Sequence, residues 1–402
     1  MFSHYPHNSK NVKLANRILI RSLIRDHEPI SRNELAKISG LTPAAVTSIV
    51  RQLIKDGNVL EVGHGESSGG RRPIHLMLNP SVTYILACRL QKGYLLMAIV
   101  DLKNNVRALK ELAIDTSSPE TVARAMGGNF QDLVARAQVP SDKVSFVSVA
   151  SPGLVNPETG TIKISVNLGW EDAPLGEAVE KAFGIPVHIE NVSNASALAE
   201  KLYGHGRGCN HLIYMGLSVG IGAGIIVNNQ IYGGALGYAG EIGHMAMTLN
   251  DGPECKCGSR GCFEAYCGVN AVIERVRAGI KEGLVSPEWS TATDTLDLTQ
   301  VLQMLHEGEP YVRSVFAEVA NIVGVVVANL INLYNPEIVV LGGELMQAGE
   351  EFLELIRQSA SARALKQLAE QVKIVKSEMT DDPGMKGAAA IALQRIFEQD
   401  LI

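Results

Sequence analysis

Residues 31–57 read SRNELAKISGLTPAAVTSIVRQLIKDG, and this stretch predicts two short helices separated by a tight turn. Ser31 and Glu34 form a capping box, in which each side chain can accept a hydrogen bond from the other residue's backbone N–H. Gly40 ends the first helix, and Thr42 caps the second. Two helices joined in this way are typical of a helix-turn-helix motif.

The second helix has two unlike faces. Its apolar side chains fall on one face, and they are Val46, Ile49, Val50 and Leu53. The other face carries small or hydroxyl-bearing side chains and one arginine, which allow a helix to lie close to base edges in the major groove of DNA. The DNA contacts predicted for this helix and its cap are Thr42, Ala44, Thr47, Ser48 and Arg51.

A predicted hairpin follows the two helices. Residues 59–62 and 73–78 are predicted strands, and the glycine-rich basic segment 63–72 joins them. An arginine at such a tip can enter a narrow minor groove, where A·T-rich sequence deepens the negative potential. We therefore expect residues 1–82 to form a winged helix-turn-helix, although a flexible linker is the alternative for the tip. The predicted wing contacts are Gly70, Arg71 and Arg72.

Charge is distributed unevenly along the chain. Residues 1–80 hold 11 Lys or Arg and 6 Asp or Glu, a balance of +5 within a chain whose net charge is −6. A basic head on an acidic body indicates that the head meets a polyanion. No run approaches the roughly 18 consecutive apolar residues of a spanning helix, and no signal pattern begins the chain. We expect a cytoplasmic protein of two or three domains without membrane contact.

The remainder of the chain alternates strands and helices. Predicted strands lie at 84–90, 94–102, 145–151, 186–191, 211–217, 223–229 and 337–343. Predicted helices lie at 118–138, 193–202, 269–282, 298–306 and 310–333. This order predicts an α/β body with a mostly parallel sheet in each half. Residues 315–334 are apolar on nearly all faces, so that helix is either buried or part of a subunit contact.

A cluster of cysteines predicts a metal site. His244, Cys255, Cys257 and Cys262 follow the spacing H-x10-C-x-C-x4-C. Three thiolates and one imidazole match a closed, tetrahedral structural Zn²⁺ site, and four protein ligands leave no open position for catalysis. The other three cysteines are interpreted as core thiols, and they are Cys88, Cys209 and Cys267.

Three segments together resemble the ROK family of repressors, open reading frames and kinases: the head with its GGRRP wing, residues 237–244 (GYAGEIGH) and residues 255–264 (CKCGSRGCFE). The resemblance covers essentially the whole chain, and the head is similar to that of the xylose, N-acetylglucosamine and glucose-type repressors. It implies an actin/hexokinase-like fold of two α/β subdomains with a cleft between them. The implied domains are the winged head 1–82, a first subdomain 83–192 with the helix 384–402 packing back on it, and a second subdomain 193–383 with the zinc site and an oligomerisation surface.

The same resemblance implies a sugar site. The sugar ligands of the family's kinases map onto Asn191, Glu241, His244 and Glu264, and Gly153 is expected to let the backbone approach the ligand. One imidazole nitrogen of His244 can bind the metal while the other offers an N–H to a sugar hydroxyl.

The catalytic residues of the family's kinases are missing. Those kinases carry a general-base aspartate after the Glu-Asn pair, where this chain has Val192. Their first phosphate loop is also absent, since residues 86–93 read LACRLQKG with no aspartate for magnesium and no glycine pair for phosphate. The glycine-rich stretch 216–224 is retained in part and is interpreted as a structural turn. We therefore expect no catalytic residues.

These observations favour a sugar-responsive transcriptional repressor of carbohydrate-utilisation genes. Its expected partners are a small sugar effector and a palindromic operator with A·T-rich flanks, which a homodimer or a dimer of dimers would bind. One alternative is an ATP-dependent sugar kinase with an appended DNA-binding head, and another is a head that binds a partner protein. The sequence leaves open which sugar acts and whether it releases or promotes DNA binding.

Overall fold

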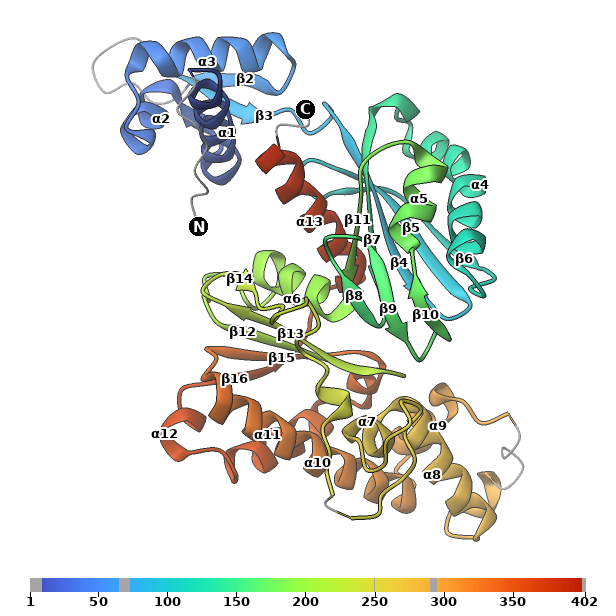
Figure 1. The fold of residues 1–402 in the computed structure, drawn as a ribbon. Helices are drawn as coiled ribbons and strands as arrows, with labels where there is room; N and C mark the ends of the chain where they lie inside the picture. Colours follow the sequence, from blue (N-terminus) through green and yellow to red (C-terminus); the bar gives the residue numbers. More distant parts are fainter. Residues whose placement is uncertain (1–8, 65–72, 249, 290–294, 400–402) are drawn as a thin grey trace.

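The computed structural model describes residues 9–64, 73–248, 250–289 and 295–399. Its N-terminal head is a three-helix unit with a small sheet of order β1-β3-β2 (Figure 1). The helices are α1 (Ser9–His27), α2 (Arg32–Ser39) and α3 (Pro43–Lys55). The strands are β1 (Ile30–Ser31), β2 (Val59–His64) and β3 (Ile74–Leu78). The predicted winged helix-turn-helix is confirmed.

The local signals in the head act as expected. The Glu34 backbone N–H donates to Ser31 Oγ at 3.3 Å, and the Ser31 N–H donates to Glu34 Oε2 at 2.8 Å. Gly40 ends α2 in the left-handed region, with φ +70°. Thr42 Oγ1 accepts from the Ala45 N–H and caps α3. The turn between the two helices is therefore fixed by hydrogen bonds that the sequence encodes directly.

The first half of the body is a five-stranded sheet of order β11-β7-β4-β5-β6. Its strands are β4 (Tyr84–Gln91), β5 (Tyr94–Asp101), β6 (Val106–Ala113), β7 (Val144–Ser151) and β11 (Val187–Asn191). Helices α4 (Pro119–Ala137) and α5 (Leu175–Phe183) pack together beside it. A small sheet of order β10-β9-β8 extends from this half, formed by β8 (Leu154–Asn156), β9 (Thr161–Ser165) and β10 (Trp170–Ala173).

The second half is another five-stranded sheet, of order β14-β13-β12-β15-β16. Its strands are β12 (Leu212–Leu217), β13 (Ile221–Val227), β14 (Gln230–Ile231), β15 (Ile338–Gly342) and β16 (Lys373–Lys376). The helices of this half are α7 (Phe263–Cys267), α8 (Val269–Lys281), α9 (Leu298–His306), α10 (Pro310–Tyr334), α11 (Glu350–Ser361) and α12 (Lys366–Ala369). Short 3₁₀ turns lie at Ser141–Lys143, Ile242–His244, Pro287–Trp289 and Glu344–Ala348.

The expectation of mostly parallel sheets is wrong. In each five-stranded sheet two strand pairs are parallel and two are antiparallel. Tight turns cause the difference, because a connection as short as the one between β4 and β5 can only join antiparallel neighbours. The glycine-rich stretch 216–224 forms the β12–β13 hairpin, in which Leu217 pairs with Ile221.

Two helices lie at the junction of the two halves (Figure 1). Helix α6 (Val192–Tyr203) contacts β12 and β13, and α13 (Pro383–Gln399) contacts α6, β4 and β7. The far end of α13 reaches α1 of the head. Head and body share one apolar core, in which Leu35 and Val50 of the head belong to the same buried cluster as Phe146 and Phe397.

Helix α10 is the long apolar helix that the sequence left unassigned. Among the described residues it alone is long and apolar enough to cross a membrane by length and composition. It packs against α8, α9 and α11, and 61% of its most apolar stretch is buried inside the protein. These contacts are those of a core helix.

Candidate metal centre and ligand cleft

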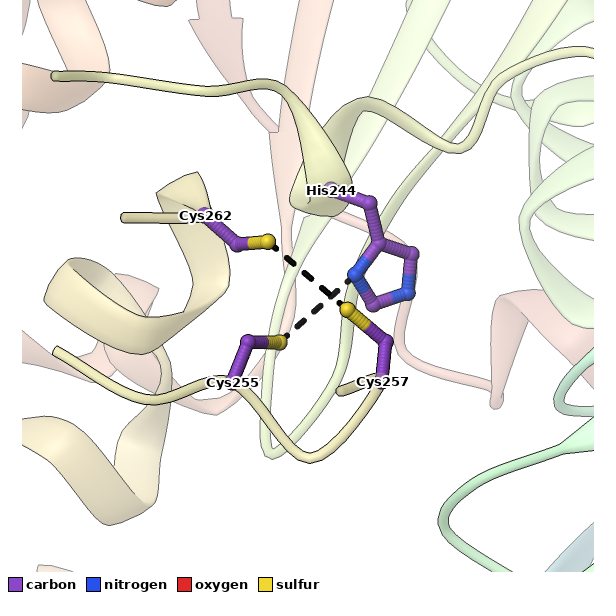
Figure 2. A group of neighbouring side chains, drawn as sticks. All are labelled: His244, Cys255, Cys257 and Cys262. Carbon is purple, nitrogen blue, oxygen red and sulfur yellow. Dashed lines mark hydrogen bonds between the residues drawn. The ribbon is translucent and has the colours of Figure 1, made fainter. Parts of the chain in front are cut away.

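His244, Cys255, Cys257 and Cys262 come together in one cluster (Figure 2). Their ligand atoms all lie within 4.8 Å of one another. Cys255 Sγ is 3.7 Å from His244 Nδ1, and Cys257 Sγ is 3.7 Å from Cys262 Sγ. Zinc–sulfur bonds of about 2.3 Å in a tetrahedron place two sulfurs about 3.8 Å apart, so the cluster has the size of a Zn²⁺ site.

Three chain segments supply these ligands. His244 ends the 3₁₀ turn Ile242–His244, which packs so closely on β13 that the Gly240 before it has no room for a side chain against the Ala223 carbonyl. Cys255 and Cys257 lie in a turn closed by the Gly258 N–H donating to the Cys255 carbonyl at 3.0 Å. Cys262 immediately precedes α7. A metal held here would tie the three segments together and fix the start of α7.

The remaining cysteines lie outside the cluster. Cys88 and Cys267 are fully buried, and burial raises the pKa of both thiols well above the ordinary value. They are the core thiols that the sequence predicted. Cys209 lies in the loop before β12 and is partly buried, and it packs against the buried core cluster that contains Leu212 and Tyr214.

Two carboxyl groups lie beside the metal cluster. Glu264 is on α7, two residues after Cys262, and its Oε2 accepts from the Ile221 backbone N–H at 2.9 Å. Burial raises the pKa of Glu241 to about 7, and the charge of Glu264 adds to the rise. The cluster occupies Nδ1 of His244, so Nε2 is the nitrogen left for a ligand (Figure 2). Carboxyl and imidazole groups supply the donors and acceptors that sugar hydroxyl groups need.

Asn191 and Gly153 lie in the first half of the body, Asn191 at the carboxyl end of β11 and Gly153 two residues after β7. Asn191 is the N-cap of α6, and its Oδ1 accepts from the Ser193 and Asn194 backbone N–H groups. Its Nδ2 donates to the Gly153 carbonyl at 2.9 Å. Most of the hydrogen-bonding capacity of this carboxamide is therefore used within the protein, and one N–H is left for a ligand.

An ion pair stands beside Val192, where the resemblance places the catalytic base. Val192 packs in a small apolar cluster with residues of α6 and α13. Arg89 on β4 forms a salt bridge with Asp382, just before α13, and both side chains are within reach of Gly384. Sequence reasoning noted the missing phosphate loop in 86–93 but missed this pair, because its partners are 293 residues apart.

The predicted DNA-contacting face of α3 is accessible. Ala44, Ser48 and Arg51 are exposed, and Thr47 is half-buried. On the opposite face Val46, Val50 and Leu53 are buried, and Ile49 packs against the same core. The predicted wing contacts Gly70, Arg71 and Arg72 lie outside the described residues.

Arg51 and Thr47 also line a surface cavity of about 290 Å³ with Arg32, Ile54 and Glu61. Arg32 Nη2 donates to Glu61 Oε1 at 2.6 Å, so the guanidinium of Arg32 is held beside the exposed face of α3. The sequence prediction did not include Arg32.

The fold and the cysteine cluster define a class of protein: a winged helix-turn-helix carried on an α/β body of two five-stranded sheets, with a Cys₃His loop that could hold a metal. Residues 15–59 match the family model described as "Winged helix-turn-helix DNA-binding", and residues 90–395 match that of the ROK family. The chain belongs to the ROK family.

Relatives match over nearly the whole chain. The xylose repressor of Caldicellulosiruptor bescii is 32% identical over 390 residues, covering 96% of this chain and 97% of the relative. The "DNA-binding transcriptional dual regulator NagC" of Escherichia coli is 30% identical over 391 residues, covering 97% and 95%.

Solved structures agree with this placement. A ROK family transcriptional regulator, described as a homolog of the E. coli MLC protein, matches with a TM-score of 0.84 and 29% identity over 97% of this chain and 98% of its own. A ROK family glucokinase from Streptomyces griseus, in complex with glucose and AMPPNP, matches with a TM-score of 0.66 and 26% identity. That match covers 77% of this chain and 99% of the kinase.

Proposed function

We propose that this protein is a sugar-responsive transcriptional repressor of carbohydrate-utilisation genes. The observation that carries the proposal is the joining, in one chain, of a winged helix-turn-helix and a body similar to a glucose-bound kinase. Repressors that match over 95% or more of both chains support it. The head binds the operator, and the body binds the sugar.

The protein is a regulator and not a sugar kinase. Val192 has no proton acceptor, and general-base catalysis contributes about 10²–10⁴-fold to such a reaction. Arg89 lies on the strand that precedes the phosphate loop in kinases, and it is paired with Asp382. The Arg89 guanidinium is itself a cation, so it cannot bind magnesium. Because it is already paired with the Asp382 carboxylate, it offers no free charge to the phosphates of ATP either.

We place the sugar site between the two halves of the body. Carboxylate, amide and imidazole groups supply the paired donors and acceptors that hydroxyl groups need. The proposed ligands are Gly153, Asn191, Glu241, His244 and Glu264. Zn²⁺ held by His244, Cys255, Cys257 and Cys262 has a structural role, because it orients the imidazole and the segment that carries Glu264.

The DNA site consists of α3 and the wing. Thr42, Ala44, Thr47, Ser48 and Arg51 face the major groove, while Gly70, Arg71 and Arg72 reach A·T-rich flanks in the minor groove. A homodimer or a dimer of dimers presents two such heads to a palindromic operator in the cytoplasm. In this proposal residues 1–82 are the DNA-binding domain. Residues 83–192 with 384–402 form the first sensor subdomain, and 193–383 form the second.

Sugar changes DNA affinity only if it binds two arrangements of the body unequally. Closure of the cleft around the sugar moves the first sheet relative to the second, and α13 spans from their junction to the head. Release of the operator is the expected direction.

Gel shifts on the DNA upstream of the protein's own gene, with and without D-xylose, D-glucose or N-acetyl-D-glucosamine, test this function. We expect specific binding that one of these sugars weakens. A head that binds no DNA but captures a partner protein, or a body that binds no sugar in calorimetry, would overturn the proposal.

A further inference from the structure

Arg89 on β4 lies beside the start of the helix that reaches the head. Its guanidinium forms a salt bridge with Oδ2 of Asp382, the residue that precedes α13. The other carboxylate oxygen of Asp382, Oδ1, accepts from the Met385 backbone N–H at 2.8 Å and so caps α13. One carboxylate therefore joins the first sheet to the first turn of α13.

A second link fastens the same turn of α13 to the first half of the body. The Lys386 Nζ donates to the Asn104 carbonyl at 2.6 Å, and the Asn104 Nδ2 donates to the Lys386 carbonyl at 3.2 Å. Asn104 is buried in the turn between β5 and β6. Because both links are made to the first half, α13 is expected to move together with the first sheet.

Glu344 brings a carboxylate of the second half to the same place. It lies two residues after the end of β15, at the start of the turn Glu344–Ala348. Burial lowers the pKa of Arg89, but the charges of Asp382 and Glu344 raise it, and the net shift is upward. Such an effect falls with distance, so the guanidinium lies within electrostatic range of both carboxylates.

Tyr214 on β12 also connects the second sheet to this ion pair. Its hydroxyl lies against Gly342 at the end of β15, where there is no room for a side chain. Burial raises the pKa of Tyr214, and the charge of Arg89 opposes that rise. The ends of β12 and β15 therefore both face the guanidinium from the second half.

Arg89 and Glu344 each have one unused atom at this junction. Arg89 Nε and Glu344 Oε2 are buried, and neither has a hydrogen-bond partner within the described residues. Charged groups that lack hydrogen bonds in a buried setting are costly. Nε–H is a donor and Oε2 is an acceptor, so these two atoms can satisfy each other. The guanidinium fork lets Arg89 bond two carboxylates at once, through Nη1 and through Nε.

We propose that Arg89 is a latch between the two halves of the body: its Nε pairs with Glu344 when the halves approach each other, while Nη1 keeps Asp382. The latch fastens the second half to β4 and to the cap of α13, so closure of the body is passed to the helix that contacts the head. This last step rests on the proposed function, in which closure releases the operator. The cation in the segment that replaces the phosphate loop thus stabilises the arrangement that does not bind DNA.

Glu344→Gln tests the latch, because it removes the charge and keeps the size of the side chain. The measurement is the concentration of D-xylose, D-glucose or N-acetyl-D-glucosamine that half-releases a fluorescent operator. We expect that concentration to rise about tenfold for the sugar that releases the parent, since closure loses one charge-assisted hydrogen bond. Operator affinity without sugar is expected to stay within about twofold of the parent, because the latch is open there. Glu351→Gln is the matched control, since Glu351 is exposed on α11.

Arg89→Lys separates the latch from the ion pair with Asp382. Lysine keeps a cation for Asp382 but lacks the planar fork that holds a second carboxylate. This variant is expected to raise the half-releasing concentration by a similar factor. Adding Glu344→Gln to Arg89→Lys is then expected to cause little further change. Additive effects in the double variant would overturn the pairing of Glu344 with Arg89.

The sugar response of the parent distinguishes the two levels of the proposal. If a sugar releases the parent and Glu344→Gln at the same concentration, the latch is wrong and the sensor function stands. If none of the three sugars releases the parent, the sensor function and the latch both fail.

Discussion

The guanidinium of Arg21 on α1 lies over the ring of Phe397 on α13, 5.0 Å from its centroid. Arg21 is fully buried, and its Nη2 donates to the backbone carbonyls of Ile396 at 3.2 Å and Phe397 at 2.9 Å. The head therefore packs against the last turn of α13. The first turn of α13 begins beside the Arg89–Asp382 ion pair. One rigid helix connects the junction of the body to the DNA-binding domain.

Arg21→Ala is expected to uncouple sugar binding from DNA release. Removing the guanidinium eliminates charged hydrogen bonds to the α13 carbonyls and costs about 2 to 3 kcal/mol of stability. Sugar affinity in calorimetry is expected to stay within about twofold of the parent, because Arg21 is remote from the cleft, yet sugar no longer shifts the operator-binding curve. Arg124→Ala, on the exposed side of α4, is the control. A full sugar response in Arg21→Ala would contradict the role of α13.

The metal cluster predicts about one zinc per chain by elemental analysis. Cys257→Ser is expected to lose the metal and, with it, the sugar response, because the segment before Glu264 is no longer held. Cys209→Ser is the matched control, since Cys209 lies outside the cluster, and it is expected to keep both. Carefully prepared parent protein without metal would show the four-ligand assignment to be wrong.

Incubation with ATP, magnesium and the bound sugar is expected to yield no sugar phosphate. Val192→Asp restores a carboxylate but leaves the Arg89–Asp382 pair in place, so it is not expected to rescue the reaction. A coupled assay for ADP with both proteins measures this. If the parent protein phosphorylated the sugar with a turnover in the ordinary enzyme range of about 1–10³ per second, the conclusion that it lacks kinase activity would be wrong.

Arg51→Ala is expected to weaken specific operator binding about tenfold to a hundredfold, because an arginine contact to a base edge is worth about 1–3 kcal/mol. Arg71→Ala is expected to act mainly on operators with A·T-rich flanks. Fluorescence anisotropy on matched operators with A·T-rich and G·C-rich flanks measures both effects. Equal loss on all DNA sequences would mean that these arginines contact only phosphates.

Much of the site could be predicted from short-range patterns. The capping box of Ser31 and Glu34, the cap at Thr42 and the spacing of the three thiolates with His244 each span fewer than twenty residues. Hydrogen bonding and metal geometry restrict such segments to few conformations, whatever the rest of the chain does. The hydrogen-bonding capacity of Asn191 could not be predicted from its residue type. Only the structure shows that its side-chain oxygen already accepts the hydrogen bonds that cap α6.

The sequence by itself determined the winged head, the α/β composition of the body and the grouping of the Cys₃His cluster, because each depends on residues close together in the chain. The valine at position 192, where the family's kinases have an aspartate, could likewise be identified from the sequence and its resemblance to that family. Only the tertiary structure decided that each large sheet mixes parallel and antiparallel strands. It also decided three long-range contacts: the Arg89–Asp382 ion pair, the approach of Asn167 to Gly220 and the cation–π contact of Arg21 with Phe397. Arg21 and Phe397 are 376 residues apart, and no local period of the chain encodes such a contact. It exists because packing of α13 between the two halves brings the end of the chain back to its beginning.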